Sequence, residues 1–463
     1  METLSSWIAR ADSFIWGPPL LVLLLGTHIF YTIRLSFVQR HLIKAFGIII
    51  KREEDSKGNI SPVSALAVAM ASTIGTGNII GGATAITLGG PGAVFWCLMT
   101  GIFGMSTKYA ESLLAVKYRA KDSNGEVHGG PMYTISNGLG MRWLAILFSI
   151  TGAIAVIGTG DLVQSNAIAA IVNRTFSVPN WITGLAVAIV IALVVIGGLQ
   201  SIASVCTKLV PLMSTIYLLG CFTLLIINVK ILPEAIAVIV KSAFCAKAVT
   251  GGLAGYGLML AARYGIARGL FSNEAGMGSE PIVAATAQAR NAVRQGLVSY
   301  TGTACTIVIC ALTGLVIVSS AIANDSIDIT NNQLLTQTAF EQIPYCGKYI
   351  LAFSIFAFAI TTVLGWCYYG EQCVLFICKK KAAIIGYRVL FVIAAFLGSI
   401  GSIAIVWDFS DLANGFMVFP NIVSLLFLSN KVVEETRKYL WSKEHLYDLD
   451  PDCQNIKYKI KDS

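Results

Sequence analysis

Charged residues are scarce in this sequence. Only 13% of its 463 residues are Asp, Glu, Lys or Arg, whereas 56% are hydrophobic, and the mean hydropathy is +0.73. Soluble globular domains usually carry about 25% charged residues. The shortage of charge excludes an ordinary soluble domain, and we expect an all-α polytopic membrane protein.

The sequence also lacks the usual patterns of metal and thiol chemistry. It has no CxxC pair among its eleven cysteines, and its four histidines do not have metal-ligand spacing. A membrane enzyme would need clustered histidines, cysteines or paired acids at catalytic spacing, so we do not expect an enzyme. Most cysteines are expected to pack as small apolar side chains. Cys245 and Cys346 both fall on the predicted outer side, which leaves a disulfide between them open.

Long apolar runs recur from end to end. A membrane-spanning helix needs roughly 20 residues to cross about 30 Å of hydrocarbon. By this criterion we predict about eleven spans, at residues 15–37, 61–88, 91–116, 143–171, 180–199, 204–229, 248–288, 296–321, 348–378, 384–407 and 411–429. Residues 1–14 do not have the basic and short apolar regions of a cleavable signal peptide, so none is expected.

Lysine and arginine gather in alternate loops. Bases lie at 34–57, 117–121, 208, 290–294, 379–381 and 431–443, and the loops between carry few bases and several acids. The positive-inside rule then places the N-terminus outside and the C-terminus in the cytoplasm. We expect a multi-pass protein of the cell membrane, with the bacterial inner membrane as its location. The net charge of +8 fits contact with anionic lipid of the bilayer, and no nucleic-acid partner is needed to explain it.

One predicted span carries the residues of a loop at its centre. The stretch "ASTIGTGNIIGG", residues 71–82, places Gly75, Thr76, Gly77 and Asn78 between two apolar halves. Glycine and asparagine are poor helix formers, and irregular backbone at membrane depth is tolerated where it lines a protein-enclosed cavity. The alternative is a tight helix crossing through small residues. A nucleotide-binding loop is excluded because the glycine spacing is wrong.

A second span is interrupted more strongly. Within "RGLFSNEAGMGSEPIVAATAQAR", residues 268–290, the run 272–281 is the most polar in an otherwise apolar segment. It is either a cytoplasmic loop or a break at membrane depth. The stretch 282–287 is apolar again and Arg290 and Arg294 follow it, which favours a break within the membrane.

The two interrupted helices are predicted to run in opposite directions. Residues 60–230 and 246–430 each hold five spans, and each half begins with an interrupted helix. Residues 1–45 add one N-terminal helix, and 431–463 form a cytoplasmic tail. Such an inverted repeat places a substrate and ion site between paired discontinuous helices, as in secondary transporters. A channel is less favoured, because there is no repeated filter sequence or ring of like charges.

Four stretches closely resemble the alanine or glycine:cation symporter family. They are "STIGTGNIIGGATAITLGGPGAVFWCLMTGIFGMSTKYAESLLAVKYR" (72–119), "GGPMYTI" (129–135), "VQSNAIA" (163–169) and "RGLFSNEAGMGSEP" (268–281). The resemblance runs in order over nearly the whole chain. It implies a leucine-transporter-type five-plus-five core with one extra N-terminal helix, importing alanine or glycine together with Na⁺. A proton-coupled carrier, or a carrier of another amino acid such as glutamine, is the alternative.

The resemblance also implies a set of site residues. The substrate is expected to contact Ser72, Thr76, Gly77, Asn78, Asp161, Gln164, Phe271, Ser272, Asn273, Thr362 and Trp366. The sodium ligands are expected to be Ala71, Ile74, Thr361 and Thr362. Free N–H groups at the start of a half-helix favour a carboxylate, here at 77–79, whereas carbonyl and hydroxyl oxygens favour a hard cation, here at 71–74.

Several of these residues have a plain structural alternative. The two threonines could bond only to carbonyls of their own helix, and Trp366 could be packing or face lipid. Asp161 stands where the family is expected to have asparagine; it would bind the substrate ammonium, a cation or a proton, or else face water at the outer end of its helix. Lys108 and Glu111 are expected to form a structural pair or gate contact. Glu274 and Glu280 are expected to bond backbone groups freed by the break, with Glu274 alternatively at an inner gate. Oligomeric state cannot be read from the sequence.

Overall fold

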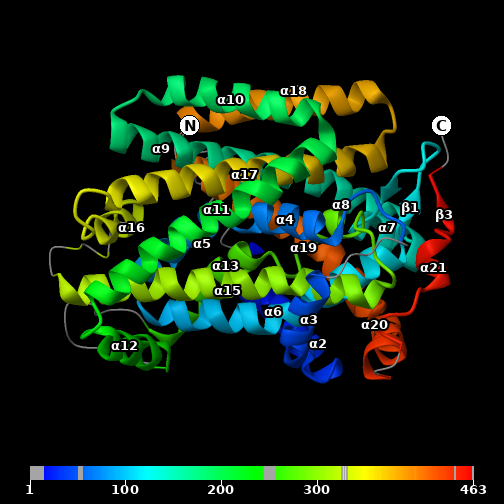
Figure 1. The fold of residues 1–463 in the computed structure, drawn as a ribbon, viewed down its shortest axis with the longest axis horizontal. Helices are drawn as coiled ribbons and strands as arrows, with labels where there is room; N and C mark the ends of the chain where they lie inside the picture. Colours follow the sequence, from blue (N-terminus) through cyan, green and yellow to red (C-terminus); the bar gives the residue numbers. More distant parts are fainter. Residues whose placement is uncertain are drawn as a thin grey trace.

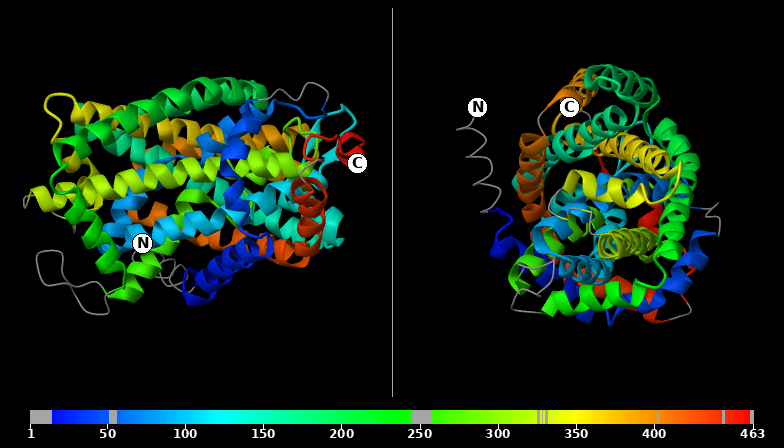
Figure 2. Two further views of the ribbon diagram at one scale, coloured as in Figure 1. Left: turned by 60° about the horizontal axis from the view of Figure 1, so that its bottom comes forward. Right: turned by 90° about the vertical axis from the view of Figure 1, so that its left-hand side faces the viewer.

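Helices dominate the computed structural model, which describes residues 15–50, 56–244, 257–324, 327, 329, 332–401, 403–442 and 445–460 (Figure 1). Cys245 and the start of the predicted second half, at residue 246, lie outside these residues. The long helices run roughly parallel to the longest axis of the bundle, and Figure 2 shows them from one end. They are α2 (Pro18–Arg34), α4 (Pro62–Thr73), α5 (Thr76–Gly89), α6 (Gly92–Lys117), α8 (Arg142–Ala155), α9 (Val163–Phe176), α10 (Asn180–Ile196), α11 (Gly198–Ile227), α13 (Leu258–Asn273), α15 (Ala292–Ala323), α17 (Gly347–Ile377), α18 (Lys381–Ile400) and α19 (Ile403–Phe427).

Shorter elements connect or interrupt these helices. The α-helical and 3₁₀ pieces are η1 (Val38–His41), α3 (Leu42–Ile49), α7 (Pro131–Tyr133), α12 (Leu232–Phe244), α14 (Pro281–Ala284), α16 (Asn332–Phe340), α20 (Ser429–Thr436) and α21 (Pro451–Gln454). The π-helical pieces are η2 (Thr134–Leu139), η3 (Val156–Leu162) and η4 (Arg437–Trp441). Of these, η3 continues α8 into α9, so that a π-helical turn lies in the middle of one span.

The outer face of the bundle is apolar. Leu193, Ile196 and Ile226 on α10 and α11 have exposed fractions of 69%, 75% and 71%. Within the described residues, seven helices are long and apolar enough to cross a membrane, and up to eight if the bent pair formed by α2 with η1 and α3 is one span. Such a surface needs lipid around it. The predicted class, an all-α polytopic membrane protein, is confirmed, whereas the count of eleven spans stays a prediction.

The base-rich loops meet at one end of the bundle. The buried guanidinium of Arg119 donates to the carbonyls of Ala285, Ala287, Lys57 and Cys453 at 2.9–3.2 Å. The predicted tail packs on this same end, where Figure 1 labels α20, α21, β1 and β3. The opposite end carries α12 and α16. The segments around Lys57, Arg119 and Ala287 and the C-terminal segment therefore lie on one side of the protein, whereas Lys208 lies within α11.

A small sheet closes the base-rich end. Its strand order is β2 (Val127–His128), β1 (Ala120–Lys121) and β3 (Tyr458–Lys459), with β1 antiparallel to β2 and parallel to β3. Lys117 forms ion pairs with Glu435 at 3.0 Å and Asp450 at 3.5 Å. The C-terminal segment is thus part of the bundle's end and not a separate folded domain.

Candidate functional site

The first predicted break is present. Helix α4 ends at Thr73, Ile74 leaves the helical region with φ −86° and ψ 84°, and α5 begins at Thr76 after the extended Gly75. A Cβ atom on Gly75 would lie 2.6 Å from the Thr362 hydroxyl, so only glycine fits here. The glycine therefore ends one helix and also allows α17 to approach the break.

The helix ends at this break are held by side chains from elsewhere. Gly75 provides no side-chain cap for α5, and the Oε1 atom of Gln164 accepts the Thr76 N–H at 3.2 Å instead. At the end of α4, the Asn78 amide donates to the Thr73 carbonyl at 2.9 Å. Asn78 and Gln164, two residues predicted from the family resemblance, thus lie directly at the break. The oxygen that caps α5 comes from a distant side chain and not from the residue preceding the helix. A carboxylate oxygen of a ligand can therefore take its place.

The second break is longer and fully buried. Helix α13 ends at Asn273, Glu274 adopts a left-handed conformation (φ 54°), and Gly276 and Gly278 follow with φ 85° and 84° before α14 begins at Pro281. Left-handed backbone favours glycine because it has no Cβ atom. Every residue from 269 to 285 is buried. The segment is therefore enclosed by the protein, as a break between two half-helices requires, and its depth in the membrane stays a prediction.

The freed backbone of the second break is bound by α6 and α19. The Glu111 carboxylate accepts the N–H groups of Gly276 at 3.2 Å and Gly278 at 3.0 Å, and it also accepts the Asn421 amide at 2.6 Å. The same Asn421 amide donates to the Gly276 carbonyl at 2.9 Å. Unpaired backbone groups at this depth would each cost several kcal/mol, so Glu111 and Asn421 make the irregular segment tolerable.

Lys108 supplies the positive charge for this segment. Its Nζ atom lies 2.8 Å from Glu280 and donates to the Glu274 carbonyl at 3.1 Å. The expected bonding of Glu274 and Glu280 to freed backbone is wrong: the Glu280 carboxylate pairs with Lys108, and the Glu274 carboxylate accepts from Ser279 at 2.6 Å and from Trp366. Glu111 performs the role that the sequence interpretation gave to these two acids.

The two breaks face each other. Ser272 Oγ donates to the Asn78 side chain, and the Phe271 ring packs so closely on Gly77 that a Cβ atom there would be 2.9 Å away. The two interrupted helices also run in opposite directions, because Ile60, just before α4, forms a bridge with Ala287, just after α14. Residues about 200 positions apart in the sequence thus form one buried centre.

Trp366 on α17 touches both breaks. Its Nε1 atom lies 3.2 Å from the Ser72 carbonyl on α4 and 3.2 Å from the Glu274 carboxylate. Its exposed fraction is 0%, so the alternative of a lipid-facing tryptophan is wrong. Small residues allow this approach: a Cβ atom on Gly160 would lie 2.3 Å from the Trp366 side chain, and one on Gly365 would lie 2.0 Å from the Ser72 hydroxyl.

The two neighbouring threonines of α17 differ. Thr362 Oγ1 reaches across to the Ala71 carbonyl at 2.8 Å and also contacts the Phe358 carbonyl of its own helix at 2.9 Å. Thr361 Oγ1 bonds to Ala357 and Phe358, both at 3.0 Å, and lies 3.5 Å from the sulfur of a methionine on α11. Only Thr362 therefore brings a hydroxyl and a carbonyl together at the end of α4. Thr361 follows the structural alternative of bonding within its own helix.

Asp161 forms no hydrogen bond to either break among the described residues. It is fully buried in the π-helical piece η3, so the alternative of a water-facing position is wrong. One carboxylate oxygen accepts from Ser165 at 3.1 Å, and the other has no hydrogen-bond partner among the described residues. Of the other expected residues, Asn273 bonds its own break, where its Oδ1 atom accepts the Ala275 N–H at 2.9 Å. Most of the expected side chains therefore gather between α4, α5, α13 and α17, whereas the hydrogen bond of Asp161 stays within its own helical span.

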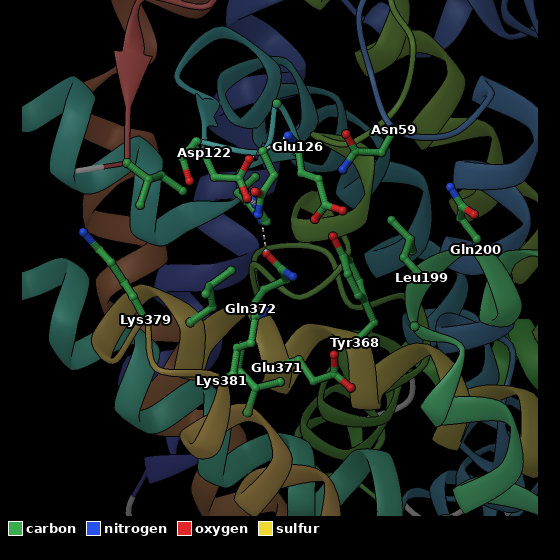
Figure 3. Close-up of a pocket in the computed structure, with 18 of the residues that line it drawn as sticks. Asn59, Asp122, Glu126, Leu199, Gln200, Tyr368, Glu371, Gln372, Lys379 and Lys381 are labelled. Carbon is green, nitrogen blue, oxygen red and sulfur yellow. Dashed lines mark hydrogen bonds and ion pairs between the residues drawn. The ribbon is translucent and has the colours of Figure 1, made fainter. Parts of the chain in front are cut away.

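A pocket of about 690 Å³ lies at the base-rich end (Figure 3). Tyr368, Glu371 and Gln372 contribute one wall from α17, a few residues beyond Trp366, and the opposite wall includes Asp122 and Glu126. At a rise of about 1.5 Å per residue, Tyr368 is only about 9 Å further along the helix axis than Thr362. The pocket thus approaches the buried centre from the side that carries the bases.

Paired, oppositely directed broken helices around a buried polar centre define a membrane secondary transporter. The chain belongs to the sodium:alanine symporter family, whose model matches residues 1–452. It is 44% identical over 443 residues to the sodium/alanine symporter AgcS of Methanococcus maripaludis, covering 94% of this chain and 97% of that protein. It is also 34% identical over 446 residues to the probable sodium/glutamine symporter GlnT of Bacillus subtilis, covering 96% and 92%.

Solved structures agree on the fold. The crystal structure of MhsT in complex with L-phenylalanine matches with a TM-score of 0.60 at 13% identity, covering 84% of this chain and 95% of that one. The predicted membership in the alanine symporter family is confirmed, as is its class as a sodium-coupled transport protein. The leucine-transporter-type fold is shown as well, at the level of overall architecture.

Proposed function

We propose that this protein imports alanine or glycine together with Na⁺ by alternating access, with the substrate between the two breaks and the ion beside Thr362. The observation that carries the proposal is the meeting of Ser72, Thr362, Trp366 and Glu274 at the broken ends of α4 and α13. A zwitterion needs both an N–H-rich and an oxygen-rich surface. The start of α5 offers the first, and the end of α4 offers the second.

For the substrate, the N–H groups at residues 77–79 would bind the carboxylate, next to the Thr76 N–H that donates to the Gln164 oxygen. The ammonium group would face carbonyls at the end of α13 and the side chains of Asn78 and Ser272. Phe271 and Trp366 fill much of the remaining space, since both are buried against the broken helices. Two bulky rings favour a side chain as small as a methyl group or a hydrogen atom.

For the ion, the Thr362 hydroxyl and the carbonyls of Ala71 and Ile74 offer the oxygen ligands that a hard cation prefers. The existing bond from Thr362 to the Ala71 carbonyl would open as Na⁺ entered between the two oxygens. Because the ion joins α17 to the end of α4 and the substrate joins the breaks to each other, each would favour binding of the other.

In the proposed transport cycle the site opens alternately to the outer and the inner side of the membrane. The five-plus-five inverted repeat and the eleven spans belong to this proposal, with the N-terminus outside and the base-rich end in the cytoplasm of a bacterial cell. The gathering of the basic loops with the tail supports this orientation. The pocket along α17 would then be the inner vestibule through which substrate leaves.

Uptake of radiolabelled alanine into proteoliposomes tests the proposal. An inward Na⁺ gradient should drive accumulation above the external concentration, and replacing Na⁺ with K⁺ at constant pH should abolish it. Accumulation that follows a pH gradient without Na⁺ would overturn sodium coupling. A glutamine carrier is the second candidate, because GlnT shares the family; unlabelled glutamine that competes better than alanine or glycine would support it.

A further inference from the structure

A β-hairpin that lines the pocket of about 690 Å³ at the base-rich end, called the inner pocket below, brings three potential metal ligands together. Strands β1 and β2 pair in antiparallel register, with Ala120 opposite His128, and their turn spans 122–126 with Gly125 at φ 90°. Asp122 is the first residue of this turn and Glu126 is the last. One ligand atom from each of Asp122, Glu126 and His128 lies within 4.8 Å of the others. The turn thus converts the local sequence "DSNGEVH" into a compact cluster of two carboxylates and an imidazole.

The imidazole is buried and fixed in orientation. His128 is only 4% exposed, and its Nδ1 atom lies 2.8 Å from the Oε1 atom of Gln372 on α17. An amide oxygen only accepts hydrogen bonds, so Nδ1 carries the proton and the lone pair of the neutral ring is on Nε2. Nε2 is buried, has no hydrogen-bond partner among the described residues, and points at the Asp122 carboxylate 3.5 Å away.

The first carboxylate is also held in place. Asp122 Oδ1 accepts the Glu126 N–H at 2.7 Å, which leaves Oδ2 directed at the imidazole. A neutral imidazole lone pair and a carboxylate oxygen repel each other unless a cation or a proton lies between them. A histidine bonded through one nitrogen to an amide or carboxylate oxygen, with the other nitrogen free, is the usual arrangement of a metal ligand.

We propose that Asp122, Glu126 and His128 bind one Zn²⁺ ion at the mouth of the inner pocket. Nε2 and one oxygen from each acid supply three ligands, and water completes a four-coordinate site. The imidazole nitrogen favours Zn²⁺ over Ca²⁺ or Mg²⁺, which prefer oxygen ligands alone. Gln372 acts as a positioning residue, since it bonds the ring at Nδ1 and is not one of the three ligands.

Such an ion would control the inner pocket. The hairpin lines one wall and α17 the other, and Gln372 joins them through His128. The same β1 strand pairs with β3 of the C-terminal segment. Bound Zn²⁺ would therefore fasten the hairpin turn to His128, which bonds α17 through Gln372, and slow opening of the vestibule. This functional consequence rests on the proposed transport function, whereas binding of the metal does not.

Zinc binding is measured on the full-length, tag-free protein in detergent after treatment with a chelator. Titration with ZnCl₂ against a chromophoric zinc chelator should show one site of micromolar or tighter affinity. Asp122→Asn, which preserves shape, should weaken that site at least tenfold, and Gln372→Leu should weaken it about tenfold. X-ray absorption at the zinc edge should show one imidazole in an otherwise oxygen shell.

The matched control is His445→Ala. His445 also lies beside an acid, with Nδ1 2.7 Å from Asp448, but both side chains are 55% exposed. This variant should bind zinc as the unaltered protein does. Absence of zinc binding by protein that still transports alanine would overturn the site, as would unchanged affinity in Asp122→Asn. In proteoliposomes, Zn²⁺ on the pocket side should slow uptake, and Asp122→Asn should resist it. Zinc binding without any alanine uptake would instead overturn the proposed transport function and leave the metal site standing.

Discussion

The indole nitrogen of Trp366 lies 3.2 Å from the backbone carbonyl of Ser72, at the last turn of α4 before the first break. The same nitrogen lies 3.2 Å from the Glu274 carboxylate in the second break. One side chain on an uninterrupted helix therefore connects two interrupted ones. Any movement that separates the breaks must lengthen or exchange at least one of these bonds.

Replacing Trp366 with phenylalanine tests this connection. Trp366→Phe keeps an aromatic ring but removes the donor, which leaves the buried Glu274 carboxylate with one bond fewer at a cost of about 1–3 kcal/mol. We expect the maximal rate of sodium-driven alanine uptake to fall by about tenfold or more. Trp181→Phe is the control, because that tryptophan on α10 is 56% exposed. Equal rates in both variants would contradict the role of the indole nitrogen.

The two threonines of α17 allow an isosteric comparison. Thr362→Val removes the hydroxyl that reaches the Ala71 carbonyl, so the Na⁺ concentration for half-maximal uptake should rise by about tenfold, equivalent to about 1.4 kcal/mol. Thr361→Val removes a hydroxyl that bonds within its own helix and should change this concentration by less than about threefold. The measurement is uptake as a function of Na⁺ at fixed alanine. A larger shift in the Thr361 variant would place the ion elsewhere.

The sequence alone located both breaks correctly. Glycine, asparagine and proline inside apolar runs are visible without any tertiary information, since they oppose helix formation locally. What it could not predict is which side chains satisfy the broken backbone. Glu111 reaches Gly278 across 167 positions, and Asn421 reaches Glu111 across 310, so no local pattern connects them.

The hairpin cluster is also invisible to the histidine pattern of the sequence. The four histidines have no metal-ligand spacing, but the turn at Gly125 brings Asp122 and Glu126 close to His128. The site residues expected from the sequence are also divided in the structure. Gln164 and Asn78 lie at the first break, whereas Thr361 bonds within α17 and Asp161 bonds Ser165 in its own span. Which side of a helix faces a site depends on packing, and η3 changes that phase within the span of Asp161.

Asp161→Asn should leave sodium coupling intact. Within the described residues the carboxyl group bonds Ser165 and forms no hydrogen bond to either break, so asparagine replaces a buried carboxyl group without removing a proposed ligand. Uptake should still require Na⁺, with a half-saturating concentration within about threefold of the unaltered protein. The measurement is alanine uptake across a range of Na⁺ concentrations at two pH values. A variant that transports without Na⁺, or that loses pH dependence present in the parent, would make Asp161 a coupling residue.

The close approach of α17 to α4 predicts that a larger residue at position 365 impairs transport and that a second substitution restores part of it. A Cβ atom at position 365 would lie 2.0 Å from the Ser72 hydroxyl, so Gly365→Ala should force the helices apart at a cost of about 1–3 kcal/mol and reduce uptake by about tenfold. Adding Ser72→Ala removes the clashing oxygen and should restore part of the activity, because the Ser72 Cβ atom is 3.2 Å away. Gly386→Ala, with nothing within 4 Å of its added Cβ, should be neutral. Failure of the double variant to recover would show that Gly365 acts through something other than this contact.

We expect the loss of Lys108 to lower the free energy of unfolding more than the loss of a lysine nearer the surface. Lys108→Met leaves the buried Glu280 carboxylate without its partner at 2.8 Å, and breaking one side of a buried pair costs about 3–5 kcal/mol. Thermal unfolding of the detergent-solubilised protein should therefore begin at a clearly lower temperature. Lys431→Met removes a partly exposed pair with Glu434 and a contact of 3.7 Å with Glu435. It should cost no more than about 1 kcal/mol, because the buried Glu435 keeps Lys117 as its partner at 3.0 Å. Combining Lys108→Met with Glu280→Gln should recover part of the lost stability, because the unpaired charge is then gone. If the double variant unfolds at no higher temperature than Lys108→Met, the ion pair is not the stabilising contact. Lys108 would then stabilise the second break through its hydrogen bond to the Glu274 carbonyl.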